Sequence, residues 1–166
     1  MNTKTYNVLF LCTGNSARSI MAEAILNVLG KGRFTAYSAG SHPSGQVQPM
    51  ARELAEAVGY DTSKIRSKSW DEFSGEDAPE MDVVITVCDN AAGESCPLWL
   101  GHPALAHWGV PDPVSATGDD NARRRAYTAA FATLRLRIEL LLSLPLQSLD
   151  RLAAQTKLRE IGTINT

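Results

Sequence analysis

One stretch near the N-terminus constrains the fold of this 166-residue chain more than any other part of it. Val8 to Leu11 is a short, continuously apolar run, which is typical of a strand buried on both faces of a parallel sheet. Cys12 follows that run, a short loop containing Gly14 comes next, and Arg18 opens an apolar pattern with helical periodicity. The stretch therefore predicts a strand, a tight loop and a helix N-terminus in direct succession.

This succession also predicts a binding site for an anion. The loop directs several backbone N–H groups and the positive end of a helix dipole at one point. Cys12 begins the loop and Arg18 closes it, with five residues between them. A thiol among amides and a guanidinium ionises more easily than free cysteine, whose pKa is about 8.5. We expect the Cys12 sulfur to be a thiolate nucleophile at neutral pH, beneath a bound tetrahedral oxyanion.

Apolar segments alternate between strand and helix periodicity along most of the chain. The expected strands are Tyr6–Leu11, Phe34–Ala39, Asp82–Val87 and a short one ending at His107-Trp108; the expected helices are Ser19–Leu29, Pro49–Val58 and about Asp119–Ser143. The alternation predicts an α/β fold with a central four-stranded parallel sheet and helices on both faces. We expect one domain over residues 1–166, with a core of about 6–144 and a C-terminal extension, 145–166, whose structure the sequence leaves open.

Composition and charge exclude several classes of protein. The net charge of −2 gives no electrostatic reason to bind nucleic acid or an anionic membrane. The apolar runs are too short to span a bilayer, and no charged-then-apolar leader precedes them. Three cysteines offer no basis for a structural disulfide framework. We therefore expect a cytoplasmic protein without nucleic-acid or membrane partners.

The loop at residues 12–19, C-T-G-N-S-A-R-S, resembles the C-x5-R-[ST] signature of the low-molecular-weight protein tyrosine phosphatase family. Its continuation, I-M-A-E-A, makes it look most like the arsenate reductases built on that fold. The resemblance extends from about Tyr6 to Leu144 and implies a low-molecular-weight phosphatase-like fold. It also implies that the loop binds an arsenate- or phosphate-like oxyanion through Thr13, Gly14, Asn15, Ser16, Ala17 and Arg18.

Asp112 stands between two prolines, which stiffen the backbone around its carboxyl group. By composition alone, an aspartate in such a turn is an ordinary turn residue. The family, however, keeps its general acid in a D-P loop after the fourth strand, and Asp112-Pro113 occupies that place. In the phosphatases an aromatic residue usually follows, whereas this chain has Val114. This difference counts against a tyrosine phosphatase.

Two further cysteines, Cys88 and Cys96, are separated by seven residues that include no proline. They could be unremarkable cysteines, or, with His102 and His107, a zinc-like set. Their separation exceeds the usual two to four residues between zinc ligands, so we expect no metal. Cys88 ends a strand at the sheet edge where Cys12 is expected, and each step of thiol exchange needs a fresh sulfur nucleophile. We therefore favour a redox relay.

The resemblance implies an arsenate reductase that serves arsenic detoxification. The Cys12 thiolate would attack arsenic while Asp112 protonates the departing hydroxide. Cys88 would then attack the Cys12 sulfur and release arsenite, and Cys96 would move the disulfide to the Cys88–Cys96 pair. No cofactor would be bound. An external thiol would reduce the enzyme: three thiols in one chain favour thioredoxin, while glutathione with glutaredoxin, or mycothiol, stays open. We expect a monomer.

Side chains near the loop complete the expected site. Ser19 could donate a hydrogen bond to the Cys12 sulfur, and Asn15 could brace the loop. Some reductases of this type bind potassium near the positions of Asn15, Glu23 and Ser38, but the acidic partner is replaced here by Lys68.

Two other functions remain open at the level of the sequence. One is a phosphatase that hydrolyses phosphomonoesters through a phosphocysteine on Cys12, for which the other cysteines are incidental. The other is a non-catalytic module that binds oxyanions.

Overall fold

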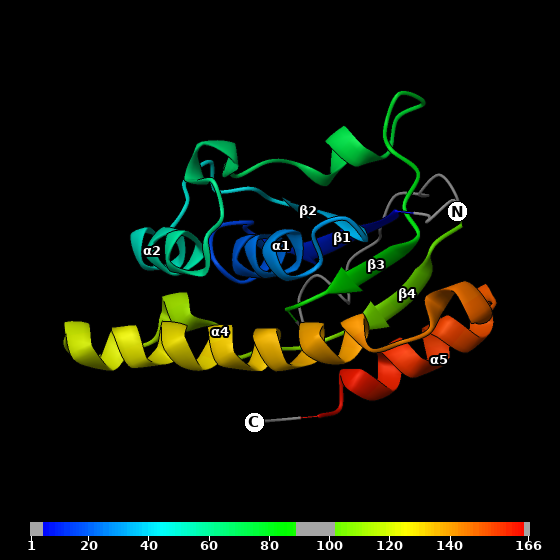
Figure 1. Ribbon diagram of the computed structural model, residues 1–166. Coiled ribbons are helices and arrows are strands. Elements are labelled where there is room, and N and C mark those ends of the chain that lie inside the picture. The colour runs from blue at the N-terminus through cyan, green and yellow to red at the C-terminus, as the bar shows by residue number, and fades with distance from the viewer. Residues whose placement is uncertain (1–4, 89–101, 165–166) are drawn as a thin grey trace.

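The computed structural model describes residues 5–88 and 102–164, and its centre is a parallel sheet (Figure 1). The strands are β1 (Tyr6–Cys12), β2 (Phe34–Gly40), β3 (Val83–Thr86) and β4 (Ala104–His107), arranged in the order β2-β1-β3-β4. All neighbouring strands within the described residues run parallel, which confirms the predicted sheet. Leu11 is level with Thr86, and Thr86 with His107. The segments that follow β1, β3 and β4 therefore leave the sheet at one edge.

The helices cover the two faces of the sheet unequally. They are α1 (Arg18–Leu29), α2 (Pro49–Val58), α4 (Asp120–Leu142) and α5 (Arg151–Ile161), with 3-10 helices at Thr62–Lys64, Trp70–Phe73, Pro113–Ser115 and Leu146–Ser148. The face that carries Val8 and Phe10 packs against α1, α4 and α5. The opposite face, with Leu9 and Leu11, packs against Phe73. The chain around Phe73 (green) lies on the side of the sheet away from α4 and α5 (Figure 1). The predicted α/β layering is confirmed.

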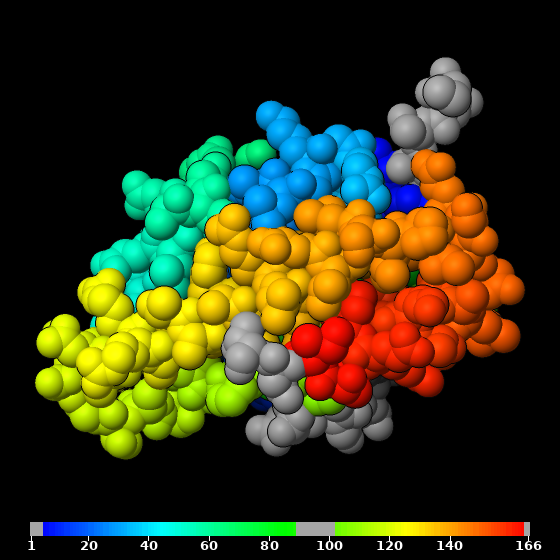
Figure 2. All heavy atoms as spheres, turned by 60° about the horizontal axis from the view of Figure 1, so that its bottom comes forward, coloured from blue at the N-terminus to red at the C-terminus, as the bar shows by residue number. Residues whose placement is uncertain are grey.

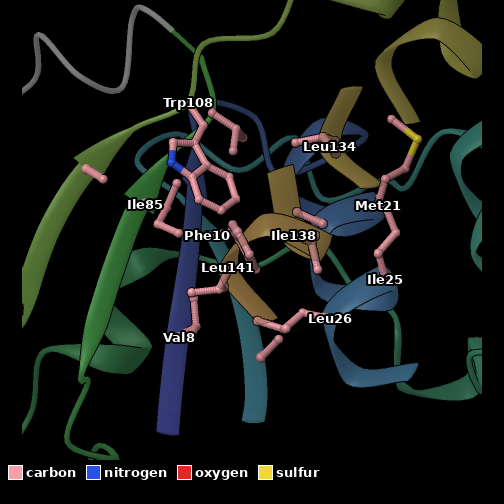
Figure 3. Close-up of a cluster of buried hydrophobic side chains, with 14 of the residues drawn as sticks. Val8, Phe10, Met21, Ile25, Leu26, Ile85, Trp108, Leu134, Ile138 and Leu141 are labelled. Carbon is pink, nitrogen blue, oxygen red and sulfur yellow. The ribbon is translucent and has the colours of Figure 1, made fainter. Parts of the chain in front are cut away.

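The main core lies between β1, β3, α1 and α4 (Figure 3). Val8, Phe10 and Ile85 point from the sheet toward Ile25 of α1 and Ile138 of α4, all fully buried. Burying one such aliphatic or aromatic side chain contributes about 1.5–3 kcal/mol. This core holds β1 and the start of α1 in fixed positions, and so fixes both ends of the loop between them.

The C-terminal segment, which the sequence left open, forms α5 and packs against β4. Ala154, Leu158 and Ile161 are buried in the main core cluster. Trp108, also fully buried, donates its indole Nε1–H to the carbonyl oxygen of Leu158 at 2.8 Å. In Figure 2, α5 (red) lies directly against the orange half of α4. Within the described residues, no helix is both long and apolar enough to cross a membrane.

Candidate active site

The loop between β1 and α1 contains one residue, Asn15, in a left-handed backbone conformation. Asn15 has a φ of 46° and is fully buried. Its Nδ2 donates to the Ser19 hydroxyl at 2.8 Å, and its Oδ1 accepts the Lys68 backbone N–H at 2.9 Å. Asparagine tolerates this backbone conformation better than most residues. The structure thus gives Asn15 the bracing contacts that the sequence suggested.

The carbonyl groups of the loop point away from its centre, because a neighbouring segment binds them. The N–H groups of His42, Ser44 and Gln48 donate to the carbonyl oxygens of residues 13, 14 and 16 at 2.9, 3.0 and 2.9 Å. In a trans peptide the next N–H points opposite to the carbonyl. The amides of residues 14, 15 and 17 are therefore directed inward, and the Asn15 N–H donates to the Cys12 sulfur.

The loop surrounds a cavity of about 170 Å³, and the residues that supply two of the inward-facing amides, Gly14 and Ala17, line it. Its walls are formed by the loop and by the turn that follows β4: Cys12, Thr13, Gly14, Ser16, Ala17, Arg18, Asp112 and Val114. Most of the predicted oxyanion-binding residues therefore surround one space together with Asp112, the predicted general acid, which is distant from the loop in the sequence. Asn15 is behind this wall rather than in it.

Arg18 stands between the loop and the Asp112 turn. Its Nη1 donates to the Val110 carbonyl oxygen at 2.8 Å, and its Nη2 is 3.6 Å from Asp112 Oδ1. Its Nε is buried, and no hydrogen-bond partner for it is found among the described residues. An unsatisfied buried donor costs about 1–3 kcal/mol. The chemistry of this donor fits an oxyanion that enters the cavity and accepts the bond.

The Asp112 carboxylate is fixed by its own turn. Asp112 Oδ1 accepts the backbone N–H of Val114 at 2.9 Å and caps the 3-10 helix Pro113–Ser115. The side chain is partly exposed at the cavity mouth, so a proton on it can be replaced from solvent. Val114 forms an apolar part of the rim, at the position where the phosphatases that the loop resembles usually have an aromatic residue.

Cys88 lies beside Cys12, although α1, β2, α2 and β3 lie between them in the sequence. The two thiols share a hydrogen bond. Both are buried, and neither is in a disulfide. The Cys88 sulfur also accepts the Thr13 backbone N–H at 3.2 Å and lies 3.5 Å from the Thr13 hydroxyl. The predicted second thiol therefore lies next to the predicted nucleophile, Cys12, which lines the cavity.

The ionisation of Cys12 differs from the sequence-based prediction. The hydrogen bond with Cys88 raises the pKa of Cys12, and burial of the sulfur raises it further. Arg18 and the Asn15 N–H act in the opposite direction but do not outweigh these causes. Two sulfurs in contact do not readily carry two negative charges. The prediction of an easily ionised Cys12 was wrong because it considered Cys12 without Cys88.

The remaining predicted residues have mixed outcomes. The Ser19 hydroxyl is bonded to Asn15 and not to the Cys12 sulfur. Cys96 lies outside the described residues. His107 Nδ1 is 2.7 Å from the Thr86 hydroxyl, a contact within the sheet. In the part of the chain that the structure describes, no three His, Cys, Asp or Glu side chains gather in a way that could hold a metal ion.

A buried polar cluster behind the loop includes one residue that the sequence did not indicate. Glu23 Oε1 accepts the Ser38 hydroxyl at 2.6 Å and lies 3.7 Å from Lys68 Nζ. Glu23 Oε2 accepts the Tyr60 hydroxyl at 2.7 Å, a contact that nothing in the local sequence predicts. Burial lowers the pKa of Lys68. The cluster supplies its own positive charge, the Lys68 ammonium, next to the Glu23 carboxylate.

Comparisons with known proteins agree with this geometry. Residues 7–155 match the family described as low molecular weight phosphotyrosine protein phosphatase. An arsenate reductase of Halalkalibacterium halodurans is 37% identical over 123 residues, covering 74% of this chain and 84% of that protein. Arsenate reductase 1 of Staphylococcus epidermidis is 33% identical over 139 residues, covering 83% and 100%. A solved arsenate reductase in the phosphate binding state superimposes with a TM-score of 0.67 at 30% identity, covering 84% of this chain and 98% of its own.

Proposed function

The chain belongs to the low molecular weight phosphotyrosine protein phosphatase family, and on that premise we propose that it reduces arsenate to arsenite. Its relationship to the arsenate reductases of this family, first indicated by the loop at residues 12–19, is confirmed by the sequence and structure matches. The observation that carries the proposal is the contact of Cys88 with Cys12, the thiol that lines the oxyanion cavity. Phosphate-ester hydrolysis needs one thiol there, whereas reduction needs two.

Arsenate binding is assigned to the loop from Thr13 to Arg18. Arsenate resembles phosphate in shape and charge, so amides arranged for one accept the other. The inward N–H groups and the free Nε of Arg18 would surround its oxygens. Because these donors are already oriented, they would also stabilise charge that develops in the transition state.

The first chemical step joins Cys12 to arsenic. In the starting state the pair carries one negative charge, on Cys88, so the Cys88 thiolate can take the proton of the Cys12 thiol, with which it shares a hydrogen bond, and become a thiol. The Cys12 thiolate then attacks arsenic, and Asp112 gives a proton to the departing hydroxide, which leaves as water. General acid catalysis of this kind typically contributes 10²–10⁴-fold in rate. The product is an adduct between the Cys12 sulfur and arsenic(V).

The second step reduces arsenic. Cys88 attacks the Cys12 sulfur and gives up its proton to the departing oxyanion. The electron pair of the sulfur–arsenic bond stays on arsenic, which leaves as arsenite, while the two sulfurs form a disulfide. Cys96 then attacks Cys88, which frees Cys12 as a thiolate and leaves a Cys88–Cys96 disulfide. Ser19 would act indirectly, by holding Asn15 and hence the loop.

An external thiol must return two electrons for each turnover. We propose thioredoxin, because it accepts a disulfide formed within one chain; glutaredoxin with glutathione is the alternative. Such thiol chemistry requires a reducing compartment, and we place the protein in the cytoplasm. There it would act in arsenic detoxification, as a monomer whose single domain spans residues 1–166.

A phosphatase is the second candidate, because the loop, Arg18 and Asp112 are sufficient to cleave a phosphomonoester through a phosphocysteine on Cys12. Two observations favour the reductase. The second thiol is hydrogen-bonded to the first, and the cavity rim carries Val114 in place of an aromatic residue.

Replacement of the second thiol separates the two functions. Cys88→Ser should abolish multiple turnover of arsenate, because no sulfur remains to displace arsenite from Cys12. The same variant should keep any cleavage of p-nitrophenyl phosphate, which needs Cys12 alone. Arsenite release in the presence of thioredoxin and its reductase measures the first activity.

Cys12→Ser is the matched control and should abolish both activities. Undiminished arsenate turnover by Cys88→Ser would rule out the reductase mechanism.

A further inference from the structure

Arg137 of α4 is a buried arginine that connects the chain just after α5 to the segment that leads to Asp112. Arg137 is only 1% exposed. Its Nε donates to the Ile164 carbonyl oxygen at 3.1 Å, and its Nη1 donates to the Gly109 carbonyl oxygen at 3.1 Å. A planar guanidinium with donors in a rigid fork fixes the carbonyls it binds relative to one another. Arg137 therefore ties two distant segments of backbone together.

The segment that Arg137 holds begins three residues before the general acid. Gly109 is followed by Val110, whose carbonyl oxygen accepts a bond from Arg18 Nη1 at 2.8 Å. The Val110 N–H donates to the Val87 carbonyl oxygen at 3.1 Å. Two successive carbonyls are thus held by two arginines, one in the oxyanion loop and one in α4. Little freedom remains for the backbone on which Asp112 is carried.

The C-terminal end of α5 contacts His107 and Trp108, the two residues immediately before this segment. The Leu158 carbonyl oxygen accepts the Trp108 indole N–H at 2.8 Å. A Cβ at Gly162 would lie 2.3 Å from the His107 carbonyl oxygen and 2.8 Å from Trp108 Cδ1, so only glycine fits. The match to the family ends at residue 155. These supporting contacts are therefore made by residues beyond the part of the chain that the family match covers.

We propose that Arg137 is a positioning residue for the reaction: with the end of α5, it holds the Gly109–Val110 segment so that Asp112 faces the Cys12 loop. Arg137 is not among the residues that line the cavity, and its described hydrogen bonds reach this backbone. Displacing a catalytic group by about 1 Å can cost on the order of 10²-fold in rate. The inference rests on the proposed role of Asp112 as general acid.

The test is a double-mutant cycle between Arg137→Lys and Asp112→Asn, measured on arsenate turnover. A lysine keeps the charge but cannot donate to both carbonyls from one rigid plane. We expect Arg137→Lys to lower kcat about tenfold while KM for arsenate stays unchanged. In the Asp112→Asn background the same substitution should change kcat less than about twofold, because the acid to be positioned is gone.

Matched controls and a second variant guard against general loss of structure. Arg135→Lys changes an exposed arginine of the same helix and should leave kcat unchanged. Gly162→Ala presses on His107 and Trp108, immediately before the Gly109–Val110 segment, and should reproduce the kcat loss and its dependence on Asp112. Gly75→Ala, where a Cβ meets open space, is its control. If Arg137→Lys does not fold, Gly162→Ala decides the question.

The outcomes distinguish this inference from the proposed function. A kcat loss that is as large in the Asp112→Asn background as in the wild type overturns the positioning role and leaves the reductase intact. A loss that appears in KM alone overturns it as well. If Asp112→Asn itself turns over arsenate at the wild-type rate, the acid role fails, and the inference fails with it. Absence of arsenate turnover by the wild type would instead reject the proposed function.

Discussion

At the scale of single residues, the contact with Cys88 governs how the Cys12 sulfur ionises. The Asn15 N–H and the Arg18 guanidinium favour a charged Cys12, but the shared hydrogen bond and burial oppose them. The Cys88 sulfur also receives the Thr13 N–H. Each of the two sulfurs therefore accepts one loop amide, and negative charge on Cys88 opposes ionisation of Cys12.

Removal of Cys88 should reveal the ionisation of Cys12 alone. In Cys88→Ala, the largest cause of the raised pKa is gone, so the pKa of Cys12 should fall and its thiolate fraction at neutral pH should rise. Ultraviolet absorbance of the thiolate, followed against pH, measures the midpoint. Cys12→Ser provides the baseline from the other thiols. A midpoint that does not move to lower pH would contradict this account of the pair.

The sequence predicted local features of the site better than remote ones. The strand, loop and helix around Cys12 follow from adjacent residues, and the bracing role of Asn15 concerns the loop in which it lies. The contact of Cys88 with Cys12 depends on the order of strands in the sheet. A pKa set by that contact cannot be obtained from the residues around Cys12.

At the scale of elements, the oxyanion loop is shaped by segments that the sequence left as plain connections. The chain from His42 to Gln48 binds the loop carbonyls, and Lys68 binds Asn15 through its backbone N–H. The Lys68 side chain also pairs with Glu23 of α1 and bonds to Ser38 of β2. This buried group therefore joins α1 and β2 to the connection that carries Lys68.

Breaking that buried pair should be far more costly than breaking an exposed one nearby. Lys68→Met leaves the Glu23 carboxylate buried without its cation and should lower the free energy of unfolding by about 3–5 kcal/mol. The exposed pair Arg66–Glu72 is the matched control, and Arg66→Met should cost less than about 1 kcal/mol. Urea unfolding of both variants measures the difference.

A second substitution tests the cause of that loss. Glu23→Gln removes the charge that Lys68→Met leaves uncompensated, so the double variant should recover part of the stability. Equal costs for Lys68→Met and Arg66→Met, or no recovery in the double variant, would be inconsistent with a buried charge pair.

Element boundaries show which patterns were sufficient. The strand predicted at Tyr6–Leu11 and the helix at Pro49–Val58 agree with the structure to within one residue, because their apolar periods and flanking glycines are clear. The C-terminal extension, 145–166, has no comparably clear apolar period, so the sequence did not predict its helix. Its helix depends on contacts with β4, and such tertiary contacts override weak local preference.

At the scale of the whole molecule, α5 covers the outer edge of the sheet and contributes side chains to the core. The outer edge of β4 would expose unpaired backbone groups, which is a common cause of aggregation. Gln155 Oε1 accepts the Leu105 N–H at 2.9 Å, and Arg159 Nε donates to the Leu105 carbonyl oxygen at 3.2 Å. Because Leu158 is fully buried in the same cluster as Phe10, α5 should fold and unfold with the rest of the molecule.

Truncation of Leu158 tests whether α5 belongs to one cooperative unit. Leu158→Ala removes a fully buried side chain and should cost about 2–5 kcal/mol. For a chain of this size that corresponds to a decrease in Tm of roughly 4–20 °C. Leu152 lies on the exposed side of α5 at 62% exposure, and Leu152→Ala should change stability by less than about 0.5 kcal/mol.

The Trp108 indole is bonded to Leu158, so tryptophan fluorescence reports on this contact, and far-UV circular dichroism reports on the helices. If the chain is one domain, the two signals should change in a single transition, and Leu158→Ala should shift it to lower temperature. If α5 instead unfolds earlier and the main transition does not shift, α5 is not part of that cooperative unit.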